Sequence, residues 1–220
     1  MIGDRAGVGC RFGRRWIRVF RVVATAVALT PFLLVVPTPV SAWNQLTCPS
    51  SGQGVKWSGG SLRVANSAGS TGSTAVNAWS SAGSANTLVL TYSSPTAVPA
   101  PHILVNMGNS GTAMPYIGLM RKPGTANAFP SCSGGFFNAQ NEAVVNTYYA
   151  TTANMQQAAL SHEVGHSFGL QHNQATELCL PNGTTRAVAV LYQGSKKWEN
   201  TSCLVLLPRP DDAAGIDALY

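Results

Sequence analysis

The residues best suited to chemistry lie in one short stretch that holds three of the chain's four histidines. It reads His162-Glu163-Val164-Gly165-His166-Ser167-Phe168-Gly169-Leu170-Gln171-His172. On a helix, His162 and His166 lie one turn apart on the same face, so both imidazoles can bind one metal ion. Gly169 can adopt a left-handed conformation that ends the helix, after which the chain can turn back and present His172.

This spacing predicts a catalytic zinc site with the ligands His162, His166 and His172. Three protein ligands leave one coordination position open, as a catalytic zinc requires. Glu163 follows the first ligand, where its carboxylate can reach a zinc-bound water without binding the metal. The alternative is three helix-face histidines with unrelated roles. The concentration of histidines in the motif argues against it.

The stretch resembles the zinc-binding motif of the metzincin endopeptidases, and the end of the chain narrows the resemblance to the matrixins. Residues 211–220 read Asp-Asp-Ala-Ala-Gly-Ile-Asp-Ala-Leu-Tyr, similar to the Asp-Asp-x-x-Gly-Ile-x-x-Leu-Tyr of the last matrixin helix. The resemblance extends over roughly residues 55–220. It implies an α+β, metzincin-like (zincin) catalytic domain with a twisted mixed β-sheet, an active-site helix and a C-terminal helix.

The resemblance also implies an activity, that of a secreted zinc-dependent endopeptidase acting on a peptide or protein substrate. Glu163 would be the catalytic residue, assisting the attack of a zinc-bound water on the peptide bond. A second hypothesis is a catalytically inactive secreted homologue that binds zinc and grips peptides or proteins. A third, a purely structural secreted protein, leaves the histidine motif unexplained.

One position departs from the metzincin pattern. Metzincins place a methionine beneath the histidines, in a turn before the last helix, whereas all five methionines here precede the zinc motif. Leu206 aligns with the missing methionine, and Leu/Met exchanges usually cost less than about 1.5 kcal/mol. We therefore expect zinc binding to be retained. The substitution should affect the cleavage rate more than it affects zinc binding. Leu207, Pro208 and Arg209 are implied to wall the pocket for the residue that follows the cut.

The first 42 residues predict a signal peptide. Six arginines precede the uncharged apolar run Val22–Val36, whose 15 residues are short for a bilayer span. Val40-Ser41-Ala42 fits a small-x-small cleavage site, which gives a secreted mature chain, 43–220, that forms a single catalytic domain. An uncleaved N-terminal anchor is the alternative, and Arg14-Arg15 leaves general and twin-arginine export both open. After cleavage we expect a monomer without a membrane association.

The formal charge of +6 comes mostly from the signal segment, which holds six of the 14 basic residues and one of the eight acidic ones. The remaining chain carries eight basic and seven acidic residues, a formal charge of +1. Apart from Lys196-Lys197 it has no basic run. The composition therefore gives no electrostatic support for nucleic acid binding.

Four of the five cysteines follow the signal segment, an even number that predicts two disulfides in an exported chain. Three pairings are possible. We favour Cys179–Cys203 and Cys48–Cys132, the second tying the N-terminal segment to the upper part of the domain. A rival role for Cys48 is a thiolate latch on the zinc.

Apolar periodicity predicts the elements that must position the motif. Strands are expected at 61–66, 87–92, 102–107 and 142–149, with a helix starting near 74 and turn-rich segments at 43–60 and 124–141. The active-site helix should span 153–168 and begin with a Thr151 or Thr152 cap. Residues 116–122 are either the edge strand that lines the cleft or an ordinary strand. His102 has no nearby partner in the sequence, so we expect it to be structural rather than a second-site ligand.

Overall fold

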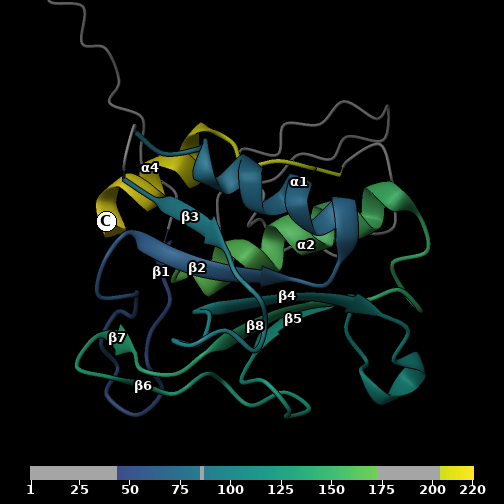
Figure 1. Cartoon of the computed structure of the whole chain (residues 1–220), viewed down its shortest axis with the longest axis horizontal. Helices are drawn as coiled ribbons and strands as arrows, with labels where there is room; N and C mark the ends of the chain where they lie inside the picture. The colour runs from purple at the N-terminus through teal and green to yellow at the C-terminus, as the bar shows by residue number, and fades with distance from the viewer. Residues whose placement is uncertain (1–43, 85–86, 173–203) are drawn as a thin grey trace, which may run out of the picture. The chain divides into compact units, whose positions relative to one another are not determined.

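The computed structural model describes residues 44–84, 87–172 and 204–220. These residues belong to one of the chain's two structural units, Pro39–Tyr220. They form an α+β structure in which two helices cover one face of a mixed five-stranded sheet (Figure 1). Among them we find no helix with the length and apolar character that a membrane span needs.

The sheet has the strand order β3-β2-β4-β8-β5. Its first four strands run parallel, whereas β5 runs antiparallel to β8 and forms one edge. The strands are β2 (Ser61–Asn66), β3 (Val89–Tyr92), β4 (Ile103–Gly108), β5 (Gly118–Arg121) and β8 (Asn141–Asn146). All six residues of β8 are buried, because strands flank it and both its faces are covered.

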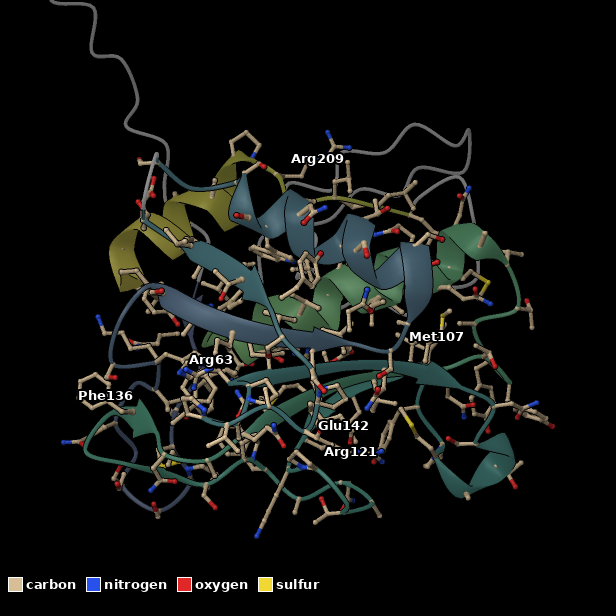
Figure 2. The ribbon with its side chains drawn as sticks, in the orientation of Figure 1. Arg63, Met107, Arg121, Phe136, Glu142 and Arg209 are labelled. Carbon is tan, nitrogen blue, oxygen red and sulfur yellow. A yellow bond between two sulfur atoms is a disulfide. The ribbon has the colours of Figure 1, made fainter. Side chains whose placement is uncertain are left out.

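The edge strand β5 is fixed to the sheet by a cross-strand ion pair. Arg121 of β5 lies opposite Glu142 of β8, and Figure 2 shows the two side chains close together. The Arg121 Nε atom lies 2.6 Å from a Glu142 carboxylate oxygen, and the Asn106 amide donates to the other oxygen over 2.6 Å. Because Glu142 is largely buried, its carboxylate loses hydration on folding, and these two partners compensate for that loss.

The helices α1 (Gly69–Ser80) and α2 (Ala153–Ser167) pack against each other on the sheet. Trp79 of α1 is fully buried, and its indole N–H donates to the Ser161 carbonyl of α2 over 2.8 Å. The indole also meets the Phe168 ring edge-on, with ring centroids 5.6 Å apart. One side chain thus contacts α2 directly before His162 and again at the helix end.

The start of α1 corrects the sequence prediction. The helix begins at Gly69 rather than near Thr74, because the side chain of Asn66 organises the polar residues that precede it. Its carbonyl oxygen accepts from the Ala68 N–H over 2.9 Å, and its amide donates to the Gly69 carbonyl over 2.8 Å. The predicted strand 142–149 is also too long, since β8 ends at Asn146.

Two segments predicted to be rich in turns contain short strands. In the first, β1 (Asn44–Gln45) pairs antiparallel with β9 (Leu170–Gln171). In the second, β6 (Cys132–Ser133) and β7 (Phe136–Phe137) form a hairpin. The Gly134-Gly135 turn of this hairpin has positive φ at both residues, 56° and 81°. A glycine pair between short strand-forming runs is a known hairpin signal, and it was present in the sequence.

The expected C-terminal helix is present as α4 (Pro210–Leu219), and a short 3-10 helix, η1, spans Gly111–Ala113. The Asp212 carboxylate accepts from the Arg209 N–H over 2.8 Å and so caps α4. The hydroxyl of Tyr220 donates to the Phe168 carbonyl over 2.6 Å. Burial raises the pKa of the Tyr220 phenol, which keeps this donor protonated at the end of α2.

Candidate metal centre

The first two histidines of the motif are presented by α2, one helical turn apart. The helix begins as predicted, because the Thr152 hydroxyl accepts from the Met155 N–H over 3.2 Å. His162 and His166 are both buried, and their ring centroids lie 4.6 Å apart. Helix periodicity alone therefore brings two imidazoles to one point.

Gly169 ends the helix and turns the chain toward the third histidine. Its φ is 106°, in the region that favours glycine, as the sequence predicted. A Cβ atom at this position would lie 2.2 Å from the Val55 carbonyl oxygen, so only glycine fits against the neighbouring chain. Leu170 and Gln171 then form β9, and His172 follows.

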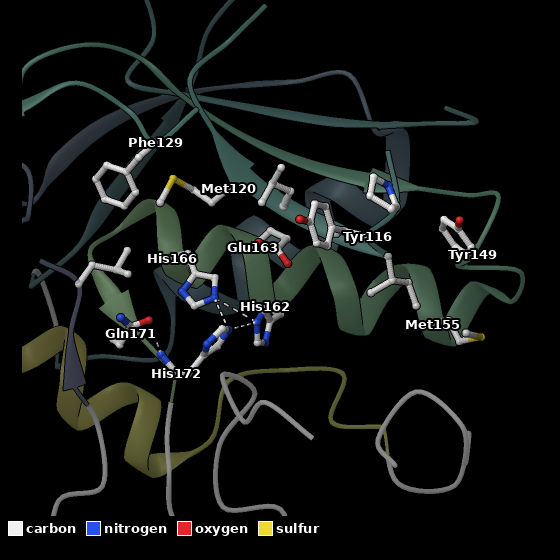
Figure 3. Close-up of a pocket in the computed structure, with 15 residues that line it drawn as sticks. Tyr116, Met120, Phe129, Tyr149, Met155, His162, Glu163, His166, Gln171 and His172 are labelled. Carbon is white, nitrogen blue, oxygen red and sulfur yellow. Dashed lines mark hydrogen bonds between the residues drawn. The ribbon is translucent and has the colours of Figure 1, made fainter. Parts of the chain in front are cut away.

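The Nε2 atoms of the three histidines converge. The distances are 3.0 Å between His162 and His166, 3.0 Å between His166 and His172, and 3.1 Å between His162 and His172. Two nitrogens bound to one tetrahedral zinc ion at about 2.0–2.1 Å lie roughly 3.3 Å apart. The triad therefore fits a metal ion of this size, and His162, His166 and His172 could hold one (Figure 3).

The hydrogen bond on the far side of His166 supports the same interpretation. Its Nδ1 atom lies 2.7 Å from the Leu170 carbonyl oxygen, which can only accept. The Nδ1 atom must therefore carry the proton, which directs the Nε2 lone pair toward the other two histidines. Metal-binding histidines are commonly fixed in this way by a carbonyl on the second nitrogen.

Glu163 lies beside the triad and against the edge strand. Its side chain is buried, and it lines the same cavity as the three histidines (Figure 3). A Cβ atom at Gly118 of β5 would lie 2.8 Å from one carboxylate oxygen of Glu163. The absence of a side chain at Gly118 thus lets the carboxylate sit between α2 and β5.

The cavity has a volume of about 720 Å³, and β5 forms one of its walls. Apart from the histidines and Glu163, its lining among the described residues is uncharged. Apolar and aromatic side chains predominate, among them Tyr116, Met120, Phe129, Tyr149 and Met155. The cleft-lining alternative for residues 116–122 is therefore the one that the structure supports.

Asn146 is hydrogen-bonded to two loops whose neighbouring residues line the cavity, and sequence reasoning missed it. Its side-chain oxygen accepts from the N–H groups of Ser110 and Tyr148 over 2.9 and 3.1 Å. Its amide donates to the Gly111 and Met114 carbonyls over 2.9 and 2.8 Å. A buried asparagine at a strand end is only weakly distinctive, so its role as a hub between two loops is visible only in three dimensions.

The segment that aligns with the metzincin methionine turn contacts α2 through its backbone. The Leu206 carbonyl accepts a hydrogen bond from Ser161, the residue before the first candidate ligand. Leu206 itself is half-buried. Leu207, Pro208 and Arg209, expected to wall a substrate pocket, are not among the described residues that line the cavity.

His102 has a structural role, as expected. Its Nδ1 atom accepts from the Arg63 N–H over 2.9 Å, and its ring meets the Trp57 ring edge-on at 4.9 Å. Burial, followed by the Arg63 charge, lowers the pKa of His102. The neutral imidazole is therefore the form that this environment favours.

The predicted disulfide between Cys48 and Cys132 is confirmed. Its sulfurs are bonded to each other, so the alternative of a Cys48 latch on the metal is wrong for this structure. The second predicted pair, Cys179–Cys203, lies outside the described residues.

Comparison with known sequences gave no match. No protein-family model matches the chain. A search of curated proteins likewise found no match. The assignment of a function therefore depends on the residues of the site.

Proposed function

We propose that this chain is a secreted zinc endopeptidase of the metzincin type, similar to the matrixins. The observation that carries the proposal is the position of Glu163 beside three converging histidine nitrogens, in a cleft walled by a sheet edge. A metal site without catalysis has no need of a carboxylate at that place. The sheet order, with an antiparallel edge strand beside the ligand helix, is compatible with the fold that the resemblance implies.

A zinc ion held by the three histidines would supply Lewis acidity, which polarises a carbonyl and lowers the pKa of a bound water to about 7. The chain's own residues would do the rest. The backbone of β5 would bind an extended peptide as an added strand and hold its scissile bond near the triad. One Glu163 oxygen would accept a proton from the attacking water and deliver it to the leaving amine nitrogen as the C–N bond breaks.

The uncharged lining of the cleft favours substrates with apolar side chains near the cut. The Cys48–Cys132 disulfide is compatible with export to an oxidising compartment. Within this proposal the protein acts as a monomer on peptide or protein substrates outside the cell.

A catalytically inactive zinc-binding homologue is the second candidate. The observation that favours it is Leu206, which stands where the related enzymes carry methionine. Such a protein would bind zinc through the same histidines and grip a peptide along β5 without cutting it.

The decisive comparison is wild type against Glu163→Gln, with denatured casein as substrate and zinc content measured by elemental analysis. We expect chelator-sensitive cleavage by the wild type, and loss of cleavage with retained zinc in the variant, because the amide cannot accept the proton. Asp217→Asn makes the same carboxylate-to-amide change outside the cleft and should retain cleavage. Full activity in Glu163→Gln would overturn the mechanism, whereas stoichiometric zinc without wild-type cleavage would favour the inactive homologue.

A further inference from the structure

The N-terminal segment 44–57 lies along the part of the chain that joins the second and third histidines. It forms a hairpin in which the Val55 N–H donates to the Leu46 carbonyl over 2.7 Å. Its first strand, β1, pairs with β9, with Gln45 opposite Leu170. The Leu46 N–H extends this pairing with a 2.7 Å hydrogen bond to the Gly169 carbonyl.

Two of the three candidate ligands depend on the backbone that this hairpin holds. The Leu170 carbonyl, which fixes the tautomer of His166, belongs to the residue paired with Gln45. His172 comes directly after β9, and the Asn44 amide donates to its carbonyl over 3.4 Å. Displacement of β1 would therefore release the support of both His166 and His172, while His162 would remain fixed by α2.

One covalent bond joins the hairpin to β6. Cys48 is fully buried in the hairpin and is bonded to Cys132 in β6. The adjacent strand β7 continues the connection, because the Phe137 N–H donates to the Lys56 carbonyl over 2.9 Å. The disulfide thus joins β6 covalently to the hairpin, and the hairpin is in turn hydrogen-bonded to β9.

We propose that the Cys48–Cys132 disulfide positions the metal ligands, so that its reduction weakens metal binding at His162, His166 and His172. This inference rests on the metal site alone and does not require peptidase activity. Leu46, Val55 and Trp57 remain packed in the core without the disulfide, so the hairpin should loosen rather than detach. We expect a partial loss of affinity, on the order of 10-fold, as for other groups that support metal ligands from the second layer.

The coupling must act in both directions. If the oxidised protein binds zinc more tightly than the reduced protein, bound zinc stabilises the disulfide by the same factor.

A phosphine supplies the two electrons for reduction. It attacks one sulfur and breaks the S–S bond, and water completes the reaction to give two thiols and a phosphine oxide. Cys48 is fully buried and Cys132 is partly buried, so the reagent reaches the bond more easily when the hairpin opens.

The first test compares zinc affinity in wild type and Cys48→Ser/Cys132→Ser, by competition with a chromophoric chelator. The double variant has neither thiol, so new zinc ligands from these cysteines are excluded. Val105→Ala, a cavity in β4 away from the hairpin, controls for a general loss of stability. An affinity about 10-fold weaker in the double variant, with Val105→Ala close to wild type, supports the proposal. Equal affinity in all three proteins, or equal weakening in both variants, overturns it.

The second test uses only the natural disulfide and remains informative if the double variant fails to fold. Wild-type protein is treated with a phosphine with and without zinc, and free Cys48 and Cys132 are counted by alkylation and mass spectrometry. Reduction should be slower with zinc, because zinc bound at the triad holds β9 and so opposes the opening of the hairpin, and this protection should be absent in His172→Ala. Equal rates with and without zinc in the wild type, or equal protection in His172→Ala, would refute the coupling.

Discussion

The hydroxyl of Ser161 donates a hydrogen bond of 2.7 Å to the carbonyl oxygen of Leu206. It connects the residue before the first histidine with the segment that precedes α4, across 45 positions of sequence. The acceptor is a backbone atom, so the contact does not depend on the side chain at position 206. Under the proposed function, leucine can therefore stand where metzincins have methionine without loss of this contact between the segment and α2.

Removal of this contact should destabilise the fold. In Ser161→Ala the Leu206 carbonyl loses its donor in a partly buried place, so the free energy of unfolding should fall by about 1–3 kcal/mol. Urea denaturation measures the change. Ser81→Ala removes a comparable hydroxyl bond to Asn77 at an exposed helix end and should change stability by no more than about 0.5 kcal/mol. Equal losses in the two variants would contradict a special role for Ser161.

Gly169 should be far less tolerant of alanine than another glycine with positive φ. Gly52 has φ 68° and open space where a methyl group would lie, so Gly52→Ala should cost only the left-handed backbone strain, about 1–2 kcal/mol. At Gly169 the new methyl group would also meet the Val55 carbonyl. We expect Gly169→Ala to lose at least about 3 kcal/mol and to bind less than one zinc per chain. Thermal unfolding and zinc analysis of both variants test this, and similar results for the two would refute it.

His102 should make stability fall in mild acid. Its pKa in the folded protein is lowered from 6.5, chiefly by burial, so the unfolded chain takes up the proton at higher pH than the folded one. The stabilisation is complete above about pH 6.5 and is lost as the pH falls toward the folded-state pKa. In His102→Gln the amide oxygen can still accept from Arg63, but the residue does not titrate.

The stability of wild type relative to His102→Gln should therefore decline between about pH 7 and pH 5. Denaturant unfolding at several pH values measures this difference, in which titration of the other three histidines cancels. A difference that is constant over this range would show that His102 does not contribute.

Zinc should stabilise the fold by mass action at the histidine triad. At a free zinc concentration 100 times the Kd, binding to the folded state adds about 2.7 kcal/mol to the free energy of unfolding. Thermal unfolding over a series of zinc concentrations measures the effect, and a chelator should reverse it. His166→Ala removes the ligand that the Leu170 carbonyl orients and should abolish the zinc dependence. An unfolding temperature independent of zinc in the wild type would exclude a metal site of this affinity.

The sequence by itself determined the parts of the site that follow from local geometry. Helical periodicity placed His162 and His166 on one face, a threonine cap at 151 or 152 began the helix, and Gly169 ended it where the chain had to turn. Runs of strand-forming residues predicted the five sheet strands, although several of their bounds were shifted by a few residues. These features depend on contacts between residues close in the chain, which composition and spacing reveal.

Tertiary structure alone decided what surrounds the histidines. The pairing of β1 with β9, the room that Gly118 leaves for Glu163, and the bond from Ser161 to Leu206 join residues far apart in the chain. No local pattern encodes such contacts, because each partner has an ordinary sequence context and gains its role only when the core brings the segments together. The three histidines are thus brought together by one helix and its turn, whereas the contacts that support them depend on the whole fold.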